Sequence, residues 1–174
     1  MPRLRRPLPR LVRLDLPVRV VRPAGTVDVL PAVIYIHGGG CILGDRNTHD
    51  PLVREIAVDT GAAVVFVDYD RSPEARYPVA IEQAYAATRY VVDHGADFRI
   101  DPSRLAVVGD SVGGNMAASL TLMARQRRGP RTAFQVLFYP GYRCRFRHGF
   151  LRSLRGWAVV DQARHAVVLG RLLA

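Results

Sequence analysis

The sequence contains no lysine, because all 25 of its basic residues are arginine. It has two cysteines, Cys41 and Cys144, too few for a disulfide framework and not spaced as metal ligands. No apolar run reaches the ~18 residues that a membrane-spanning helix needs, and no Gly-Lys phosphate loop is present. These absences argue against zinc, nucleotide and membrane-spanning functions. We expect a cytoplasmic protein that uses no cofactor and no metal.

The positive charge is concentrated at the two ends of the chain. Residues 1–22 and residues 141–174 each hold seven arginines and one acidic residue, which accounts for the net charge of +10. Basic arms can bind nucleic acid, but neither arm carries a recognised nucleic-acid motif or a series of aromatic residues for stacking. We expect no nucleic-acid partner, and binding through the arms is the least favoured of our hypotheses. The sequence carries no signal for an oligomeric state.

The segment between the arms alternates apolar strands with amphipathic helices, a pattern typical of parallel βαβ units. We interpret residues 1–17 as a basic arm, 18–140 as an α/β core and 141–174 as an arginine-rich tail. Proline near a helix start and glycine after its end mark the helices. The expected strands are 18–21, 32–36, 63–68, 105–108 and 134–138, and the expected helices are 50–59, 79–94 and 113–128.

The pentapeptide Gly109-Asp110-Ser111-Val112-Gly113 follows one of these strands and opens a helix. A G-x-S-x-G pattern in that context is typical of a nucleophile elbow, where the chain turns so sharply that glycines must flank the serine. The N-terminus of the helix would favour an anion there. Because glycine-flanked serines also occur in ordinary turns, the pentapeptide alone leaves both interpretations open. Ser111 is the best candidate nucleophile.

A second motif favours the catalytic interpretation. The strand at residues 32–36 runs into His37-Gly38-Gly39-Gly40, which matches the HGGG-type loop of an oxyanion hole. Glycines let backbone N–H groups approach a substrate carbonyl closely. A plain flexible turn would need neither the preceding histidine nor a partnered G-x-S-x-G motif downstream.

Together these motifs resemble the bacterial hormone-sensitive-lipase-like branch of the α/β-hydrolases, which are carboxylesterases and lipases. By this resemblance Ser111 is the nucleophile, and the N–H groups of Gly38, Gly39 and Val112 form the oxyanion hole. A complete domain of this family is considerably longer than 174 residues. We therefore expect a partial α/β-hydrolase three-layer sandwich with a mostly parallel sheet, lacking the last strands and the cap. The resemblance also rests on Asp68-Tyr69, Ser72-Pro73-Glu74, Tyr77-Pro78, Gly114-Asn115 and Phe138-Tyr139-Pro140.

The acid and the histidine of a catalytic triad have no recognisable counterpart. Both should follow the serine in an α/β-hydrolase, which excludes Asp68 and Asp70. In the tail, no strand pattern precedes His148, Asp161 or His165, so we do not assign them. We interpret His37 as structural and both His49 and His94 as solvated helix caps.

We expect a serine hydrolase of small carboxylic esters in which Ser111 attacks the carbonyl. Without a general base the chain would hydrolyse short p-nitrophenyl esters slowly or not at all. The alternative is a non-catalytic remnant or ligand-binding protein that keeps an ester-shaped pocket. Ending the regular pattern at residue 138 should also leave strand 134–138 as an unpaired apolar edge.

We predict that the tail is an out-of-frame translation caused by one extra base after the codon for Pro140. Residues 142–149, re-read in that frame with permitted synonymous codons, can yield T-D-A-D-F-D-T, which resembles the family's continuation. Residues 165–173 can likewise yield M-R-W-F-W-D-A-Y. The shift would explain the arginine excess, since GC-rich DNA read out of frame often encodes arginine. Sequencing the gene tests this: absence of these strings, or an immediate stop, would show that the tail is genuine.

Overall fold

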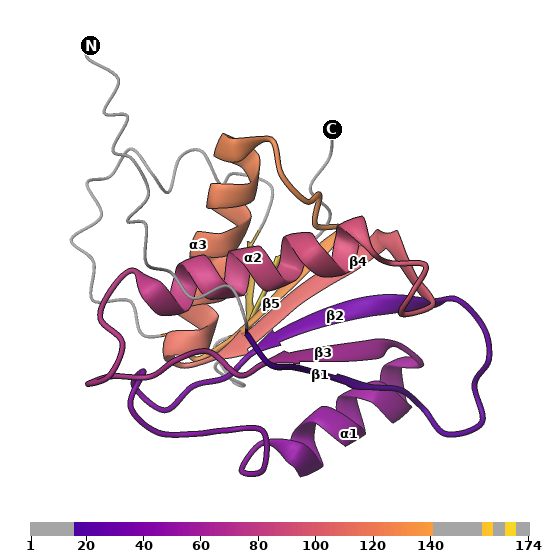
Figure 1. The fold of residues 1–174 in the computed structure, drawn as a ribbon, viewed down its shortest axis with the longest axis horizontal. Helices are drawn as coiled ribbons and strands as arrows, with labels where there is room; N and C mark the ends of the chain where they lie inside the picture. Colours follow the sequence, from indigo (N-terminus) through magenta and orange to yellow (C-terminus); the bar gives the residue numbers. More distant parts are fainter. Residues whose placement is uncertain (1–15, 141–157, 162–165, 170–174) are drawn as a thin grey trace.

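A computed structural model describes residues 16–140, 158–161 and 166–169 of this chain. A single sheet has the strand order β1-β3-β2-β4-β5-β7-β6 (Figure 1). The helices of the described part are α1 (Asp50–Thr60), α2 (Val79–Asp93) and α3 (Val112–Arg127). The strands are β1 (Val18–Val21), β2 (Leu30–Ile36), β3 (Ala63–Val67), β4 (Ile100–Asp110), β5 (Phe134–Phe138), β6 (Ala158–Asp161) and β7 (Ala166–Leu169).

The centre of the sheet is parallel. β2 pairs in parallel with β3 and β4, and β4 pairs in parallel with β5. Parallel neighbours need crossover connections, which α1, α2 and α3 provide in turn. The predicted alternation of strands and helices is therefore confirmed. The main difference is that β4 begins at Ile100, because its first residues also pair with β2 before the register shifts after Pro31.

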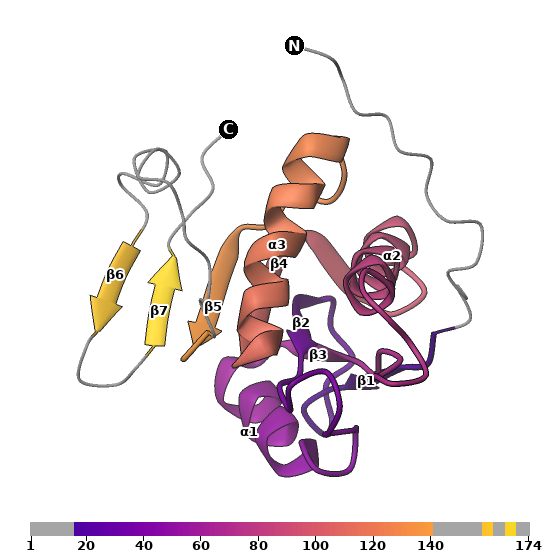
Figure 2. The same ribbon diagram turned by 90° about the vertical axis from the view of Figure 1, so that its left-hand side faces the viewer.

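The sheet separates two helical layers, with α2 and α3 on one face and α1 on the other (Figures 1 and 2). Side chains alternate along a strand, so Ile34 and Ile36 of β2 pack toward α2 and α3, whereas Val33 and Tyr35 pack toward α1. The predicted three-layer α/β sandwich is confirmed. On the α1 face, a groove of about 450 Å³ lies over parts of β4 and β5.

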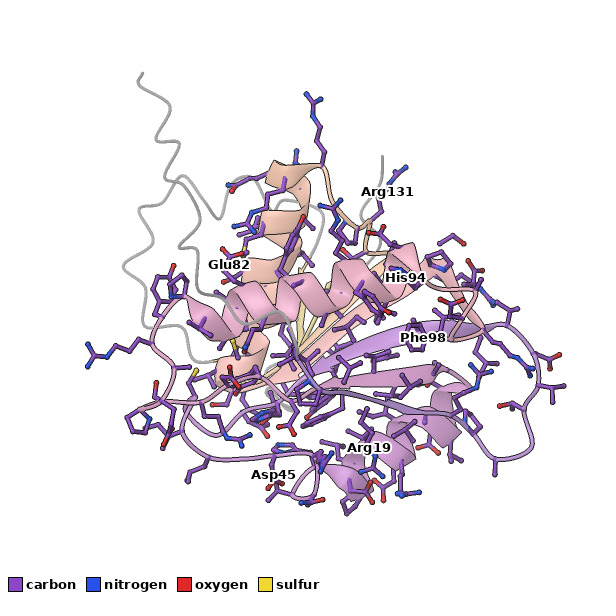
Figure 3. All side chains as sticks on the ribbon, viewed as in Figure 1. Arg19, Asp45, Glu82, His94, Phe98 and Arg131 are labelled. Atoms are coloured by element: carbon purple, nitrogen blue, oxygen red, sulfur yellow. The ribbon has the colours of Figure 1, made fainter. Side chains whose placement is uncertain are left out.

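Side chains tie α2 to α3. Arg127 donates two hydrogen bonds of 2.7 Å to the carboxylate of Glu82, which lies beside α3 (Figure 3). The Arg127 guanidinium also covers the Tyr85 ring, 4.8 Å from its centroid. The face of α2 predicted to pack in the core does so, with Ile81, Tyr85 and Thr88 buried and Val92 half-buried.

The expectation that β5 forms an unpaired edge is wrong. β5 pairs antiparallel with β7 from Gln135 to Phe138, and β7 pairs antiparallel with β6. The short runs AVVD and AVVL have the β-branched composition that favours strands, and the second of them, β7, takes up the open hydrogen bonds of β5. Asp161 ends β6, which corrects the expectation that no strand lies there. His148 and His165 lie outside the described residues.

We predict that Leu120→Ala lowers the free energy of unfolding by about 2–5 kcal/mol, because it leaves a cavity in the core under α3. Leu120 is fully buried there. Leu122 in the same helix is 37% exposed, so Leu122→Ala is a matched control that should cost under about 1 kcal/mol. Urea unfolding measures both, and equal losses would contradict the assigned core.

Candidate active site

Ser111 occupies a sharp turn between β4 and α3. Its backbone has φ 51° and ψ −119°, a left-handed conformation that residues with a side chain rarely adopt. The turn is held by a hydrogen bond of 2.9 Å from the Ser111 N–H to the Phe138 carbonyl on the neighbouring strand. This is the strained geometry that the elbow motif predicts.

The glycines of the elbow leave room for the backbone itself. A Cβ on Gly109 would overlap the carbonyl of Gly113, so the strand and the helix could not fold back on each other. A Cβ on Gly113 would overlap the carbonyl of Ile36 at the end of β2. The elbow therefore lies directly against the start of the loop that follows β2.

That loop contains the HGGG motif. Gly39 and Gly40 have φ values of 94° and 67°, which glycine adopts without strain. The N–H of Leu43 donates to the Gly39 carbonyl at 2.8 Å, and a Cβ on Gly39 would overlap that same turn of chain. The glycines at these positions are thus required by the backbone path of the loop.

A carboxylate joins the loop to the elbow. Asp110 Oδ1 accepts hydrogen bonds from the Gly38 N–H at 2.9 Å and from the Tyr35 hydroxyl at 2.8 Å. The Gly38 N–H is therefore already engaged. In contrast, no hydrogen bond from the Gly39 N–H is found within the described residues, and Val112 begins α3, where N–H groups have no partner in a preceding turn.

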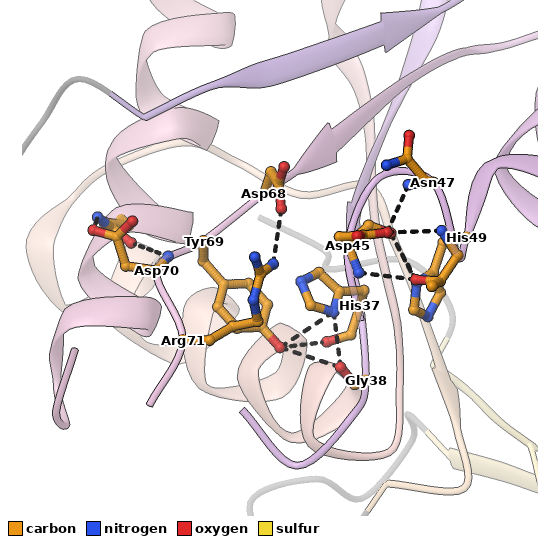
Figure 4. A network of polar contacts seen from close by, with 11 residues as sticks. His37, Gly38, Asp45, Asn47, His49, Asp68, Tyr69, Asp70 and Arg71 are labelled. Carbon is orange, nitrogen blue, oxygen red and sulfur yellow. Dashed lines mark hydrogen bonds and ion pairs between the residues drawn. The ribbon is translucent and has the colours of Figure 1, made fainter. Parts of the chain in front are cut away.

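The His37 side chain supports the glycine loop from the side of the sheet. Its fully buried ring stacks on Tyr69 with centroids 4.2 Å apart and on Phe66 at 5.3 Å. Its Nδ1 lies 2.8 Å from the Gly38 carbonyl, which assigns the hydrogen to Nδ1, while Nε2 has no partner among the described residues (Figure 4). Burial lowers the pKa of His37, so the ring is neutral at pH 7. The structural role predicted for His37 fits this placement.

The tyrosine of this stack also bonds to the loop. The Tyr69 hydroxyl donates to the His37 carbonyl at 2.9 Å and lies 3.3 Å from the Gly38 carbonyl (Figure 4). Burial raises the pKa of Tyr69, so its hydroxyl keeps its proton at physiological pH. The backbone at the start of the glycine loop is therefore held by a buried donor.

His49 takes the N-cap position of α1, as predicted, but its side chain makes no capping hydrogen bond and is only 18% exposed, so the prediction that it is solvated is wrong. His49 precedes α1, but its ring is half-buried, 5.2 Å from the His37 ring centroid, and its Nε2 lies 4.0 Å from Asp110 Oδ1. Asp45 bends the preceding turn inward by accepting the N–H groups of Asn47 and Thr48 at 2.8 Å (Figure 4). His94, at the end of α2, is exposed and stacks on Tyr90, as a terminal residue can (Figure 3).

The two acids after β3 do not form a pair. Asp68 accepts a hydrogen bond of 3.0 Å from Arg71, and Asp70 bonds to the side-chain amide of Gln83 on α2 at 2.7 Å. Each carboxylate thus holds a different piece of the chain after β3. This agrees with leaving both out of the triad.

A pocket of about 520 Å³ lies between the segment of residues 70–78, the first turn of α2 and α3. Its lining includes Cys41, which follows the HGGG motif, and Val112, which follows Ser111. Its apolar lining includes Ile81, Met116 and Met123, whereas Asp70 and Arg76 are charged. The arrangement can hold an apolar group next to a serine hydroxyl.

A family profile described as the alpha/beta hydrolase fold matches residues 33–163. The chain belongs to this family. The match contains both the glycine loop and the elbow, and it confirms the resemblance read from those motifs. The mostly parallel sheet with helices on both faces is the fold expected of such a hydrolase.

Named members of the α/β-hydrolases are similar to this chain. It is 49% identical over 126 residues to the carboxylesterase NlhH of Mycobacterium tuberculosis, covering 72% of this chain and 40% of that protein. The crystal structure of a thermostable esterase from Pseudomonas putida superposes with a TM-score of 0.73 at 45% identity, covering 80% of this chain and 44% of the esterase. The chain therefore spans less than half the length of these relatives.

The described residues hold no metal-binding cluster and no helix that could span a membrane, and their cysteine is unpaired. In the described part of the chain, no cluster of three or more metal-ligating side chains occurs, and Cys41 is a free thiol whose pKa is raised by burial. None of the helices at residues 50–60, 79–93 and 112–127 is long and apolar enough to cross a bilayer.

We predict that the free energy of unfolding falls as the pH drops below about 6.5, the ordinary pKa of histidine. Below that value the unfolded chain binds a proton that the folded state, with its lowered His37 pKa, does not. His37→Phe keeps the ring stack and should weaken this pH dependence in urea unfolding. His94→Phe, at an exposed site, is the control, and an unchanged slope in His37→Phe would contradict the prediction.

Proposed function

We propose that this chain carries the nucleophile and the oxyanion-binding groups of a serine carboxylesterase. The observation that supports this most directly is Ser111 itself, held with φ 51° at the start of α3 and packed against the glycine loop. Similar proteins are named carboxylesterases and esterases, which favours ester hydrolysis over a pure binding role.

In the proposed reaction, Ser111 Oγ attacks the carbonyl carbon of the ester and the carbonyl oxygen becomes an oxyanion. Gly39 and Val112 donate N–H groups to that oxygen, assisted by the positive end of α3. Gly38 was the third donor expected from the sequence. Because its N–H is bonded to Asp110, we propose that Gly38 anchors the loop and contacts the oxyanion only if that bond opens.

The attack also needs a base that accepts the serine proton. No hydrogen bond joins the Ser111 hydroxyl to another group in the described part of the chain. The Nδ1 of His37 is engaged with the Gly38 carbonyl, and the His49 ring lies beside Asp110, with Nε2 4.0 Å from Oδ1. We therefore propose that the base is supplied from outside the described residues.

The pocket beside Val112 suggests the kind of substrate. Its volume of about 520 Å³ and its mostly apolar lining suit an apolar chain of a small-molecule ester, and Met116 and Met123 in that lining can adapt to chains of different shape. We propose that this pocket takes one of the two apolar parts of the ester, next to the attacked carbonyl.

An alkyl fluorophosphonate tests the nucleophile. We expect slow labelling of Ser111, seen as a mass increase, because the elbow and the oxyanion donors are in place while no base contacts Ser111 within the described residues. We also expect p-nitrophenyl ester turnover below about 1 s⁻¹. Ser111→Ala should abolish labelling. The control Ser103→Ala, at the opposite end of β4, should leave labelling unchanged.

The outcomes separate the two functions. Ser111-dependent labelling supports the esterase assignment. No labelling of the wild-type chain would favour a ligand-binding protein that keeps the pocket. Ser111-dependent turnover above about 1 s⁻¹ would show that the chain already contains a base.

A further inference from the structure

The carboxylate of Asp110 lies where the two halves of the proposed oxyanion hole meet. Asp110 ends β4 and directly precedes Ser111, yet its side chain turns back to the loop after β2, where Oδ1 accepts the Gly38 N–H at 2.9 Å. The two residues are 72 positions apart in the sequence. One hydrogen bond therefore links the glycine loop to the elbow.

We propose that Asp110 is a positioning residue that holds the glycine loop against the elbow and sets the spacing between the N–H groups of Gly39 and Val112. This inference rests on the proposed function. Gly39 follows Gly38 directly, and Val112 is two residues beyond Asp110. Short covalent links thus carry the effect of the Gly38–Asp110 bond to both donors.

The absence of a side chain at residue 38 fits this role. A Cβ there would overlap Oδ2 of Asp110 and would lie 2.9 Å from the Asp110 backbone carbonyl. Any larger residue would push the carboxylate away from the loop. Glycine at this position therefore serves the contact with Asp110, independently of any substrate.

A second donor fixes the carboxylate in place. The Tyr35 hydroxyl donates to the same Oδ1 at 2.8 Å, and the fully buried Tyr35 ring stacks on Phe66. Burial, reinforced by the Asp110 charge, raises the pKa of Tyr35, so the phenol remains a donor. Hydrogen bonds to a carboxylate are stronger than neutral ones, and this carboxylate is only 13% exposed. The contact that holds the loop thus consists of one acceptor, Asp110 Oδ1, and two buried donors, the Gly38 N–H and the Tyr35 hydroxyl.

Variants at residue 110 separate hydrogen bonding from charge. Asp110→Asn keeps an acceptor oxygen, whereas Asp110→Ala removes it. Tyr35→Phe removes one donor and leaves the carboxylate in place. Asp101→Ala is the matched control, because Asp101 lies at the other end of β4 and bonds only locally to Ser103 and Arg104.

Two measurements are made on the whole chain. The first is amide hydrogen exchange, by mass spectrometry, in the peptide spanning residues 37–44. We expect exchange to be about tenfold faster or more in Asp110→Ala, closer to wild type in Asp110→Asn, and intermediate in Tyr35→Phe. The second is the rate of Ser111 labelling by an alkyl fluorophosphonate, expected to fall about 100-fold in Asp110→Ala and less in Asp110→Asn. Asp101→Ala should change neither.

The inference is overturned if amide exchange in residues 37–44 of Asp110→Ala is as slow as in wild type. It is also overturned if exchange in Asp110→Ala is faster but Ser111 is labelled at the wild-type rate. If Asp110→Ala does not fold, Tyr35→Phe and Asp110→Asn decide it: labelling at the wild-type rate in both, with faster loop exchange in either, overturns it. If wild type itself is not labelled, the proposed function fails. The exchange data then decide separately whether Asp110 holds the loop.

Discussion

Direct backbone contact between the elbow and the end of β2 is the constraint on which the candidate site depends. A Cβ on Gly113 would overlap the Ile36 carbonyl, and a Cβ on Gly109 would overlap the Gly113 carbonyl. These contacts force β4 to turn into α3 at Ser111 with a positive φ. They also bring the glycine loop beside Ser111, since the loop starts one residue after Ile36.

Side chains on both sides of this contact hold the glycine loop in place. His37, stacked on Tyr69 and Phe66, supports the loop from the sheet, and Asp110 holds it from the elbow. A carboxylate beside an oxyanion site would repel the developing negative charge. Two hydrogen-bond donors on Oδ1 reduce this repulsion, so that Asp110 can hold the loop at a lower electrostatic cost.

This chain matches less than half the length of the esterases that it resembles. The chain spans 40% of one carboxylesterase and 44% of a solved esterase structure, and it contains the candidate nucleophile Ser111 and the glycine loop. Both lie where β2, β4 and the first turn of α3 pack against each other. Within the described residues no hydrogen bond joins the Ser111 hydroxyl to a base, in keeping with the proposal that the base lies outside them.

Local sequence determined the elements and the two motifs, because short-range patterns control them: apolar runs of strand length, proline and glycine at helix ends, and the glycines around Ser111 and after His37. This was enough for the α/β sandwich and the candidate nucleophile. Tertiary structure alone decided that Gly38 bonds to Asp110, that His49 packs against His37, and that β7 covers β5. These contacts join residues far apart in the chain, and no local pattern encodes which distant groups the fold brings within hydrogen-bonding distance.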